Sequence, residues 1–464
     1  MNKRIFFLIY FIIIKIVIDK SSSIEIPFKG LPPINNNDYI LSNYNVDIYI
    51  SFQVGSEKDK LDKIFLKSDT NEFMIAKTDL AINNNKYDAE LSSSSKKIVY
   101  LKSYNLKYTS RAFIFKDKFF LFDSKNNMQT EFNDISFLYA DSLRVEKYPG
   151  IIGLQLVEND IKNAKPIPCQ FADLEYANNA TWMIKFNSNE EGYFYIGDIL
   201  NENIFPGFDK ENYRKTNAVV YNFYLSWDLT FSQIKSNDII LNGPMQAFLD
   251  FNFGLISCSN EYYNLIKKDF FDGYIKEGKC EQIFYNKDDN NKIKVDYNFN
   301  YIVCDKSLKI KDFPDILFFH SALDFIFKLD YNDVFLNYND KIYFLIINEL
   351  DKNERWKLGR IFFKKYNIIF DNNAKTIGIY DDRYSKSKVV LIIFEWIIAI
   401  LLIFATLFLA YTLIKRYRIN NYKAFIKKEK VDEMDENLDS FFEKNKDNKL
   451  INMEEKKDEE NNKI

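Results

Sequence analysis

A long apolar stretch at residues 389–414 constrains this chain more than any other feature. It is long enough to cross a bilayer. Its one acidic residue, Glu395, lies near one end, where its side chain can reach the membrane surface. The basic sequence KRYR follows directly at residues 415–418. Because basic residues favour the cytosolic side of a membrane, we expect one transmembrane helix with residues 24–388 outside the cytosol.

The N-terminus has the layout of a secretory signal. Basic residues precede an apolar run, and serines follow at residues 21–23. Lys15 interrupts the apolar run, which argues against a second membrane span. We therefore predict a signal peptide at residues 1–23, followed by a short lead segment at 24–39. The chain is then a single-pass type I membrane protein of the secretory pathway or cell surface, with an endolysosomal location as one option.

The C-terminal segment, residues 415–464, is charged and low in complexity, which predicts a disordered cytosolic tail. Within it, the sequence YKAF at residues 422–425 fits the tyrosine-x-x-apolar pattern of endocytic and lysosomal sorting signals. Tyr422 and Phe425 would be its two recognition residues. The alternative is a chance match, because the chain holds 31 Tyr and 44 Phe residues.

The composition excludes several classes of chemistry. The one histidine, His320, lies in an apolar strand-like run and is expected to be structural, so neither a Ser-His-Asp triad nor a histidine-rich zinc site can form. The cysteines show no CxxC spacing, and we expect no metal and no cofactor. The net charge is −3 and the central region has no basic run, so nucleic acid is not an expected partner.

The region from about 40 to 383 consists mainly of short strand-like runs separated by turn residues, which predicts a mostly β protein. Two runs, at 261–275 and 353–366, have helical patterns. Two apolar strands end in an aspartate, IFLKSD at Asp69 and MQAFLD at Asp250. Each is followed by an apolar stretch with a glycine turn, the first YPGIIGLQL at 148–156 and the second WKLGRIFFKKYNIIFD at 356–371. The sequence thus indicates a duplicated organisation with one aspartate in each copy.

These segments, taken in order, resemble the pepsin-like aspartic protease family. The strongest match is WKLGRIFFKKYNIIFDNNAKTIGI, which is similar to the Trp-x-Leu-Gly signature of the family's second lobe. The segments YPGIIGL, EGYFYIGDI and WDLTFSQI also resemble family segments. The resemblance implies a bilobal β fold with a central cleft, an N-terminal lobe at 40–205 and a C-terminal lobe at 206–383.

The resemblance also implies a catalytic pair. Asp69 and Asp250 would occupy the dyad positions, one ionised as general base on a water and the other protonated toward the scissile carbonyl. Thr70, which follows the first aspartate, would supply a hydroxyl to the network around the dyad. Tyr104 is the expected counterpart of the tyrosine in the family's substrate-covering flap, and Tyr108 is a competing candidate.

Covalent features follow from the same resemblance. Cys280 and Cys304 lie where the second lobe usually has a disulfide, which the lumen would permit. Cys169 and Cys258 have no family counterparts and either pair with each other or stay as small buried side chains. The sequon at Asn179 is a possible glycosylation site, with chance occurrence in an Asn-rich chain as the alternative.

The active-site motifs depart from the family pattern. Asn71 and Asn252 replace the two motif glycines, and their side chains would crowd the carboxylates. Phe251 cannot donate the hydrogen bond that a threonine makes there. Glu72 could add a third carboxylate and raise the pKa of the pair if it points inward.

Three functions therefore remain open from the sequence. The first is a membrane-anchored aspartic endopeptidase with an altered dyad environment. The second is an inactive pseudoprotease that binds an extended peptide or protein in the cleft, as a surface or sorting receptor would. The third is a purely structural surface protein in which both aspartates are ordinary turn residues. In each case we expect a monomer.

Overall fold

The computed structural model describes most of the chain in separate ranges. These are residues 23–30, 38–56, 59–71, 73–77, 87–102, 109–123, 128–143, 150–156, 165–188, 190–221, 224–286, 297–350 and 355–460. The described chain forms two compact units, residues 1–386 and 387–464. Residues 1–22 of the predicted signal peptide, Tyr104, Tyr108 and Glu72 lie outside the described residues.

The first unit is mostly β. Its largest sheet has 13 described strands in the order β11-β26-β25-β9-β10-β1-β2-β3-β8-β4-β7-β6-β5. The strands contributed by the first half of the chain are β1 (Ile24–Gly30), β2 (Ile48–Val54), β3 (Asp59–Lys67), β4 (Phe73–Ala76), β5 (Lys96–Lys102), β6 (Thr109–Asp123), β7 (Met128–Leu143), β8 (Gly150–Gly153), β9 (Thr181–Phe186) and β10 (Glu191–Ile196). Three strands from the second half join the same sheet, β11 (Tyr213–Asn217), β25 (Asn367–Asp371) and β26 (Thr376–Tyr380).

A second large sheet, with 11 described strands, belongs to the second half alone. Its strands are β14 (Asp228–Ser236), β15 (Ile239–Leu249), β16 (Ile256–Ser257), β17 (Cys280–Tyr285), β18 (Phe299–Cys304), β19 (Ile316–His320), β20 (Phe325–Leu329), β21 (Phe335–Tyr338), β22 (Lys341–Phe344), β23 (Ile346–Glu349) and β24 (Trp356–Leu358). A separate hairpin pairs β12 (Val219–Tyr221) with β13 (Tyr224–Ser226).

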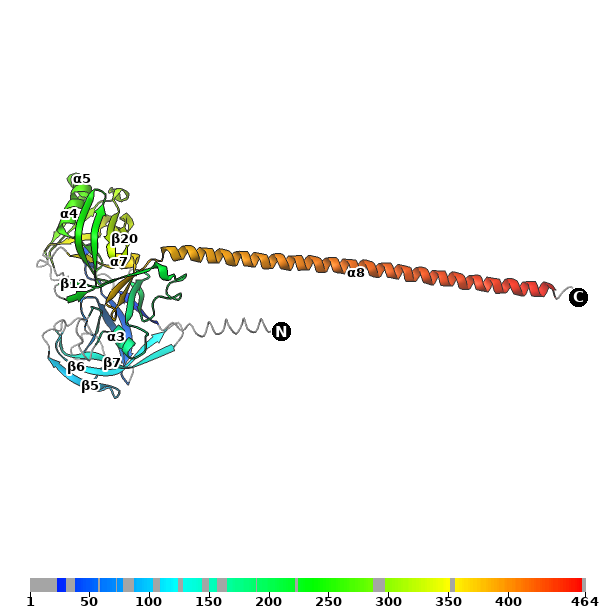
Figure 1. Cartoon of the computed structure of the whole chain (residues 1–464), viewed down its shortest axis with the longest axis horizontal. Coiled ribbons are helices and arrows are strands. Elements are labelled where there is room, and N and C mark those ends of the chain that lie inside the picture. The colour runs from blue at the N-terminus through cyan, green and yellow to red at the C-terminus, as the bar shows by residue number, and fades with distance from the viewer. Residues whose placement is uncertain are drawn as a thin grey trace. The chain divides into compact units, whose positions relative to one another are not determined.

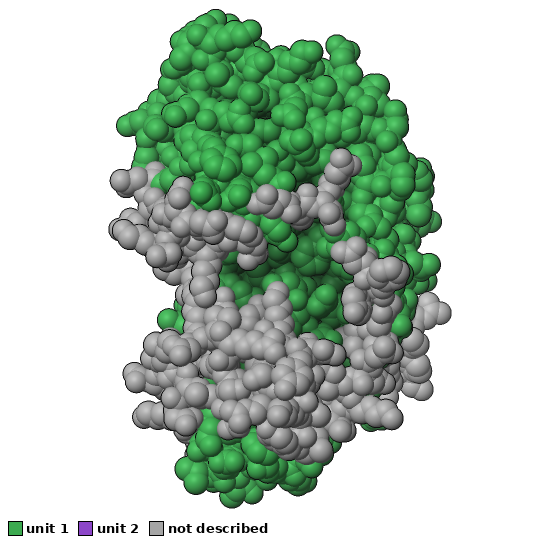
Figure 2. Space-filling model, turned by 90° about the vertical axis from the view of Figure 1, so that its left-hand side faces the viewer, with its two compact units in different colours: residues 1–386 green, residues 387–464 purple. Residues whose placement is uncertain are grey.

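Helices in the described part of this unit are short. They are α2 (Tyr39–Asn43), α3 (Ile167–Asp173), α4 (Asn260–Ile266), α5 (Asp272–Lys276), α6 (Tyr331–Val334) and α7 (Arg360–Lys365), with single turns η1 (Lys210–Asn212), η3 (Ile310–Asp312) and η4 (Ser321–Leu323) and a π-helical turn η2 (Lys267–Phe271). Figure 1 shows α4, α5 and β20 in one lobe and β5, β6, β7 and α3 in the other. Figure 2 shows that one face of this unit is hollowed at its middle.

Both lobes contain the same arrangement of four strands. In the first lobe, β8 pairs in parallel with β3 and antiparallel with β4, and β4 pairs in parallel with β7. In the second lobe, β24 pairs in parallel with β15 and antiparallel with β16, and β16 pairs in parallel with β23. The duplicated bilobal β fold predicted from the sequence is therefore confirmed.

Buried aromatic rings hold the two lobes together. Trp182 of β9 stacks on Phe370 of β25, with ring centroids 4.1 Å apart. The indole Nε1 of Trp227, just before β14, donates a hydrogen bond to the carbonyl of Leu154 in the first lobe at 2.7 Å. Both tryptophans are almost fully buried, so this junction is an interior rather than a hinge surface.

The segment that contains α2 packs on the second lobe, although the sequence assigned residues from 40 onward to the first lobe and Tyr39 to the lead segment. Tyr44 stacks on Phe299 at 5.0 Å and meets the edge of Phe253 at 5.4 Å. Ile40 joins the same buried cluster. Aromatic packing of this kind, rather than position along the chain, decides where the segment lies.

The second unit is one continuous helix. Helix α8 spans Arg383–Glu460, and its segment Trp396–Lys423 is long and apolar enough to cross a membrane. The helix extends through residues 415–460, where composition predicts disorder. Glu, Lys, Leu and Met are strong helix formers, and a charged sequence rich in them can continue a helix even though it cannot build a core.

The remaining predicted features are distributed over both lobes. Cys280 and Cys304 lie opposite each other on β17 and β18 and form a disulfide. Cys169 and Cys258 both remain thiols, so they do not pair with each other. The Nδ1 atom of His320 accepts a hydrogen bond from the backbone N–H of Leu323 at 3.2 Å, which caps a helical turn, as expected for a structural histidine.

Candidate active site

The candidate site lies where the two equivalent strands, β3 and β15, end. Strand β3 ends at Lys67, whose carbonyl accepts a hydrogen bond from Leu154 N at 2.8 Å. Strand β15 ends at Leu249, and the next residue, Asp250, donates its backbone N–H to the carbonyl of Leu358 at 3.0 Å. Each loop is thus fixed by the neighbouring strand of its own lobe.

The strand registers define which residues of the two loops correspond. In the first lobe, Leu66 pairs with Ile152, which pairs with Phe73. In the second lobe, Leu249 pairs with Leu358, which pairs with Ile256. The two connections, 67–72 and 250–255, have the same length. The register therefore places Lys67 at the position of Asp250, and it places Asp69 at the position of Asn252.

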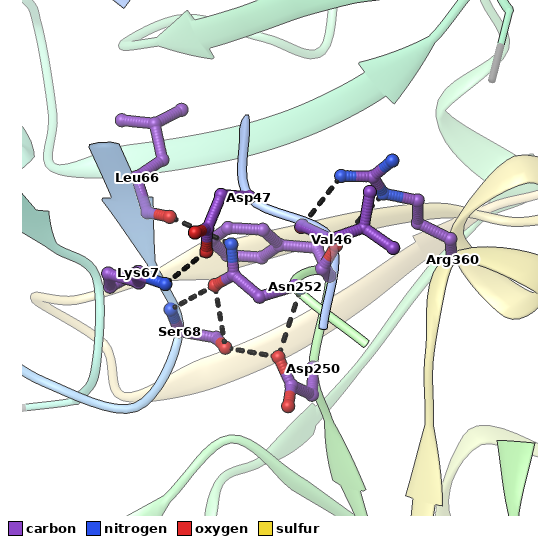
Figure 3. A network of polar contacts seen from close by, with 9 residues as sticks. Val46, Asp47, Leu66, Lys67, Ser68, Asp250, Asn252 and Arg360 are labelled. Atoms are coloured by element: carbon purple, nitrogen blue, oxygen red, sulfur yellow. Dashed lines mark hydrogen bonds and ion pairs between the residues drawn. The ribbon is translucent and has the colours of Figure 1, made fainter. Parts of the chain in front are cut away.

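Lys67 is a buried cation with a buried partner. Its Nζ atom forms an ion pair with Oδ1 of Asp47, just before β2, and the two side chains are 9% and 5% exposed. Ion pairs survive burial only when each charge is compensated, which this pair achieves directly. Both residues are drawn in Figure 3, at the end of β3.

Asp250 is held by donors from both loops. Its Oδ1 atom accepts hydrogen bonds from Ser68 Oγ at 2.5 Å and from Asn252 N at 3.0 Å. Its other carboxyl oxygen points away from both donors (Figure 3). The Asp250 side chain is half-buried. The surrounding protein disfavours its charged form, which raises its pKa. The Lys357 charge and the Ser68 hydrogen bond oppose this rise, and the negative charge of Asp69 adds to it.

Asn252 ties the second loop to the first. Its Oδ1 atom accepts from Ser68 N at 3.0 Å and lies 3.2 Å from Ser68 Oγ, while its Nδ2 atom donates to the carbonyl of Leu66 at 2.9 Å. The backbone of Asn252 is not left-handed, so an asparagine fits this position without strain. The amide that replaces a glycine thus points into the first loop and replaces the lost threonine link, rather than crowding the Asp250 carboxyl.

Ser68 was not recognised as a site residue from the sequence, and Asn252 was expected only to crowd the carboxylates. Their signal was present, because a hydroxyl and an amide next to the two aspartates can bond across a loop interface. Phe251 was expected to break that link. Its side chain is buried beside Trp182, with the two ring centroids 6.3 Å apart. Thr70 is buried in the first lobe, where its carbonyl accepts from Gln155 N at 2.8 Å.

Arg360 connects the second loop to the chain segment before β2. Its Nη2 atom donates to the carbonyl of Val46 at 2.8 Å, and its Nε atom donates to the carbonyl of Phe251 at 3.3 Å. In return, Val46 N donates to the carbonyl of Asn252 at 2.7 Å. Arg360 is only 4% exposed, and this burial lowers its pKa to about 10. The guanidinium remains charged at physiological pH.

A partly buried cation, Lys357, lies on β24 next to the second loop. The Nζ atom of Lys357 lies 3.1 Å from Oε1 of Glu349 and 4.4 Å from the ring centre of Phe253. The hydroxyl of Tyr44 donates to the same Glu349 oxygen. The Lys357 and Glu349 side chains are 12% and 0% exposed, so this charge pair is fixed in place.

Among the described residues, no group of three or more His, Cys, Asp and Glu side chains could hold a metal ion.

The geometry agrees with the comparison to known families. The family described as eukaryotic aspartyl protease matches residues 64–381 of the chain. No curated protein sequence matches it. The matched range contains both loops, the strands that hold them and the inter-lobe junction.

Proposed function

Because this chain belongs to the eukaryotic aspartyl protease family, we propose that it keeps the family's peptide-binding cleft but binds an extended peptide or protein segment without cutting it. The observation that carries this proposal is the register of β3, in which a lysine stands where β15 has Asp250. Family chemistry needs two carboxyl groups that share one proton. An ammonium group bonded to Asp47 can neither accept a proton from water nor share one with Asp250.

The other contacts of the two loops also support binding without cleavage. Ser68 and Asn252 hold the carboxyl of Asp250 by hydrogen bonds. Arg360 holds the second loop through its hydrogen bond to the carbonyl of Phe251. The site has therefore not collapsed, as a site without a ligand-binding role would be free to do. The main-chain groups of an extended peptide are its general source of affinity in such grooves.

The apolar helix supports a membrane-anchored form of this binding protein. The apolar part of segment Trp396–Lys423 would span the bilayer once. The residues from Lys415 onward, which include the possible sorting motif at Tyr422 and Phe425, would then face the cytosol. A receptor that carries lumenal peptides or proteins between compartments of the secretory pathway combines these parts.

One observation favours a working endopeptidase as the second candidate. The charge of Asp69 contributes to the raised pKa of Asp250, so the two carboxyl groups interact. In that case Asp69 would act as the base and Asp250 would hold the proton, with Ser68 and Asn252 keeping the proton off Oδ1.

The two functions separate in one assay. The full-length chain in detergent is incubated with a random decapeptide library from pH 3 to pH 7, and mass spectrometry reads both cleaved products and retained peptides. We expect retained peptides and no products. Products that disappear in both Asp69→Asn and Asp250→Asn would establish the endopeptidase. If the folded protein neither yields cleaved products nor retains peptides, both functions are contradicted.

A further inference from the structure

The charges of helix α8 beyond its apolar part are separated by sign along the chain. Residues 415–430 carry seven basic side chains and one acidic side chain, Glu429, which gives a net charge of +6. Residues 431–443 carry six acidic and no basic side chains, a net charge of −6, and residues 444–464 carry six of each sign. The seven basic residues are Lys415, Arg416, Arg418, Lys423, Lys427, Lys428 and Lys430. Solubility alone is served by mixed charges, so this separation indicates a charged partner.

Apolar and aromatic side chains lie among the basic ones. Figure 1 shows α8 as one continuous helix through this segment, and the side chains of Tyr417, Ile419, Tyr422 and Phe425 are exposed on it. Tyrosine is common at the boundary between hydrocarbon and water, because its ring is apolar and its hydroxyl is polar. Apolar rings beside lysine and arginine therefore fit a membrane surface better than open solvent.

The length of the helix keeps this basic segment close to the bilayer. The apolar stretch at residues 389–414 is about 39 Å long at about 1.5 Å per residue, whereas the hydrocarbon core is about 30 Å thick. An apolar helix longer than the core can tilt, which brings the residues after it toward the surface. The headgroup layer and the field of its charges together extend about 14 Å from the hydrocarbon. Lys428, about 21 Å along the axis from residue 414, comes within reach of this field through tilt and its long side chain.

We propose that residues 415–430 bind the anionic lipid headgroups of the cytosolic leaflet. Their basic side chains attract the phosphate and carboxylate groups of such lipids. The acidic residues at 431–443 are repelled by the same lipids, so the contact ends there. The possible sorting motif, Tyr422 and Phe425, lies inside the bound segment and is covered by the lipid. This inference rests on the membrane anchoring in the proposed function and adds the surface that the tail contacts.

The first test measures which lipids surround the full-length chain in phosphatidylcholine bilayers that also contain phosphatidylserine. Electron paramagnetic resonance of spin-labelled lipids compares the affinities of the two lipids for the protein. We expect phosphatidylserine to bind about fivefold more tightly, because one charge near an oppositely charged surface changes affinity by about that factor. Since exposed charges are screened by ions, this preference should largely disappear in about 1 M salt.

A triple variant locates the contact on the basic segment. Lys423→Gln, Lys427→Gln and Lys428→Gln together lower the net charge of residues 415–430 from +6 to +3. The attraction for an anionic headgroup weakens with the charge, so the preference for phosphatidylserine should fall to about twofold.

A second triple variant is the matched control. Lys444→Gln, Lys446→Gln and Lys449→Gln together remove the same amount of charge from the same tail. These lysines lie beyond the acidic residues, where the field of the bilayer no longer acts. The preference for phosphatidylserine should therefore equal that of the unchanged chain.

A second measurement reports whether the possible sorting motif is covered. Trypsin cleaves after lysine; the bond after Lys423 lies inside the motif, and the bond after Lys444 lies beyond the acidic residues. When phosphatidylserine is added to the bilayer, cleavage after Lys423 should slow about fivefold, because bound lipid shields that bond. Cleavage after Lys444 in the same molecule should keep its rate. Mass spectrometry of the released fragments measures both rates.

The outcomes separate this inference from the anchoring on which it rests. Equal affinity for the two lipids, a preference that salt does not weaken, or the same loss in both triple variants would overturn the lipid contact alone. Cleavage after Lys423 that phosphatidylserine does not slow would show that the motif is not covered. A full-length chain that does not float with the bilayers would contradict the anchoring as well.

Discussion

Lys67 and Asp250 end two equivalent strands with opposite charges, and each is served by its own buried partners. Asp47 compensates Lys67, while Ser68 and Asn252 hold Asp250. Lys67 and Asp250 thus belong to separate polar networks rather than to one shared pair. These two residues are where the molecule differs most from the pair of carboxyl groups that its family's chemistry needs.

The Lys67 pair should be important for stability. Lys67→Met leaves Asp47 charged in a buried place, so we expect the free energy of unfolding to fall by about 3–5 kcal/mol at neutral pH. Urea unfolding of residues 23–386, followed by tryptophan fluorescence, measures this change.

The double variant Lys67→Met with Asp47→Asn is the control for that prediction. It removes both charges together, and most of the lost stability should return. A single variant as stable as the unchanged chain would show that Asp47 does not depend on Lys67.

The Cys280–Cys304 disulfide could be predicted from the sequence, and so could the place of Asp250 at the end of an apolar strand, because both follow from the order of family-like segments along the chain. The correspondence of Lys67 could not. Asp69-Thr70 matches the expected residue types two positions further along, and residue types alone do not fix a loop's alignment. Only the pairing of Leu66 and Phe73 with Ile152 fixes it, because a strand's register is set by packing partners far away in the sequence.

At the scale of elements, the turn between β24 and α7 brings the second loop and the chain before β2 together. A Cβ atom added to Gly359 would lie 2.2 Å from the carbonyl oxygens of both Leu255 and Phe253. Backbone that approaches this closely leaves no room for any side chain. The next residue, Arg360, reaches past this contact to Val46.

Gly359→Ala should therefore destabilise the fold by about 3 kcal/mol, because the two carbonyls that it meets are backbone and cannot move aside cheaply. A thermal melt of residues 23–386 measures the loss. Gly273→Ala in α5 is the matched control, since nothing lies within 4 Å of its added Cβ atom. Its melting temperature should stay the same or rise slightly.

The strands and the two helical runs were predictable from local patterns, but their boundaries were not. The predicted helix at 353–366 is strand β24 followed by α7, which begins only at Arg360. Trp356 and Leu358 have apolar side chains that fit either state. Pairing with β15 and β16 decides for a strand, which no local pattern can show.

At the scale of the whole molecule, the chain consists of a β unit and a helix with separate roles. The large buried core lies within residues 24–380, and the apolar side chains described along α8, such as Trp396, Phe404 and Phe408, are exposed. The span could be predicted from hydropathy alone. The length of the helix could not, because helix formation in a charged tail depends on weak local preferences.

A chain cut after residue 386 should therefore fold and remain in solution, whereas the full chain should need detergent or membrane. Gel filtration and circular dichroism of the two forms test this. Aggregation of the shortened chain, with loss of its β spectrum, would show that α8 contributes to the fold. A cut after residue 375 is the control, since it removes β26 and should prevent folding.

Strand β26 has a mechanical consequence. It ends at Tyr380, three residues before α8 begins at Arg383, and it is hydrogen-bonded along its length to β11 on one side and β25 on the other. Tension on the anchored tail thus pulls along a strand clamped on both edges, so many bonds must break together before the strand slips. The load enters the sheet that joins the lobes at β26, far from β3 in the strand order, so the shear falls first on the pairings with β11 and β25.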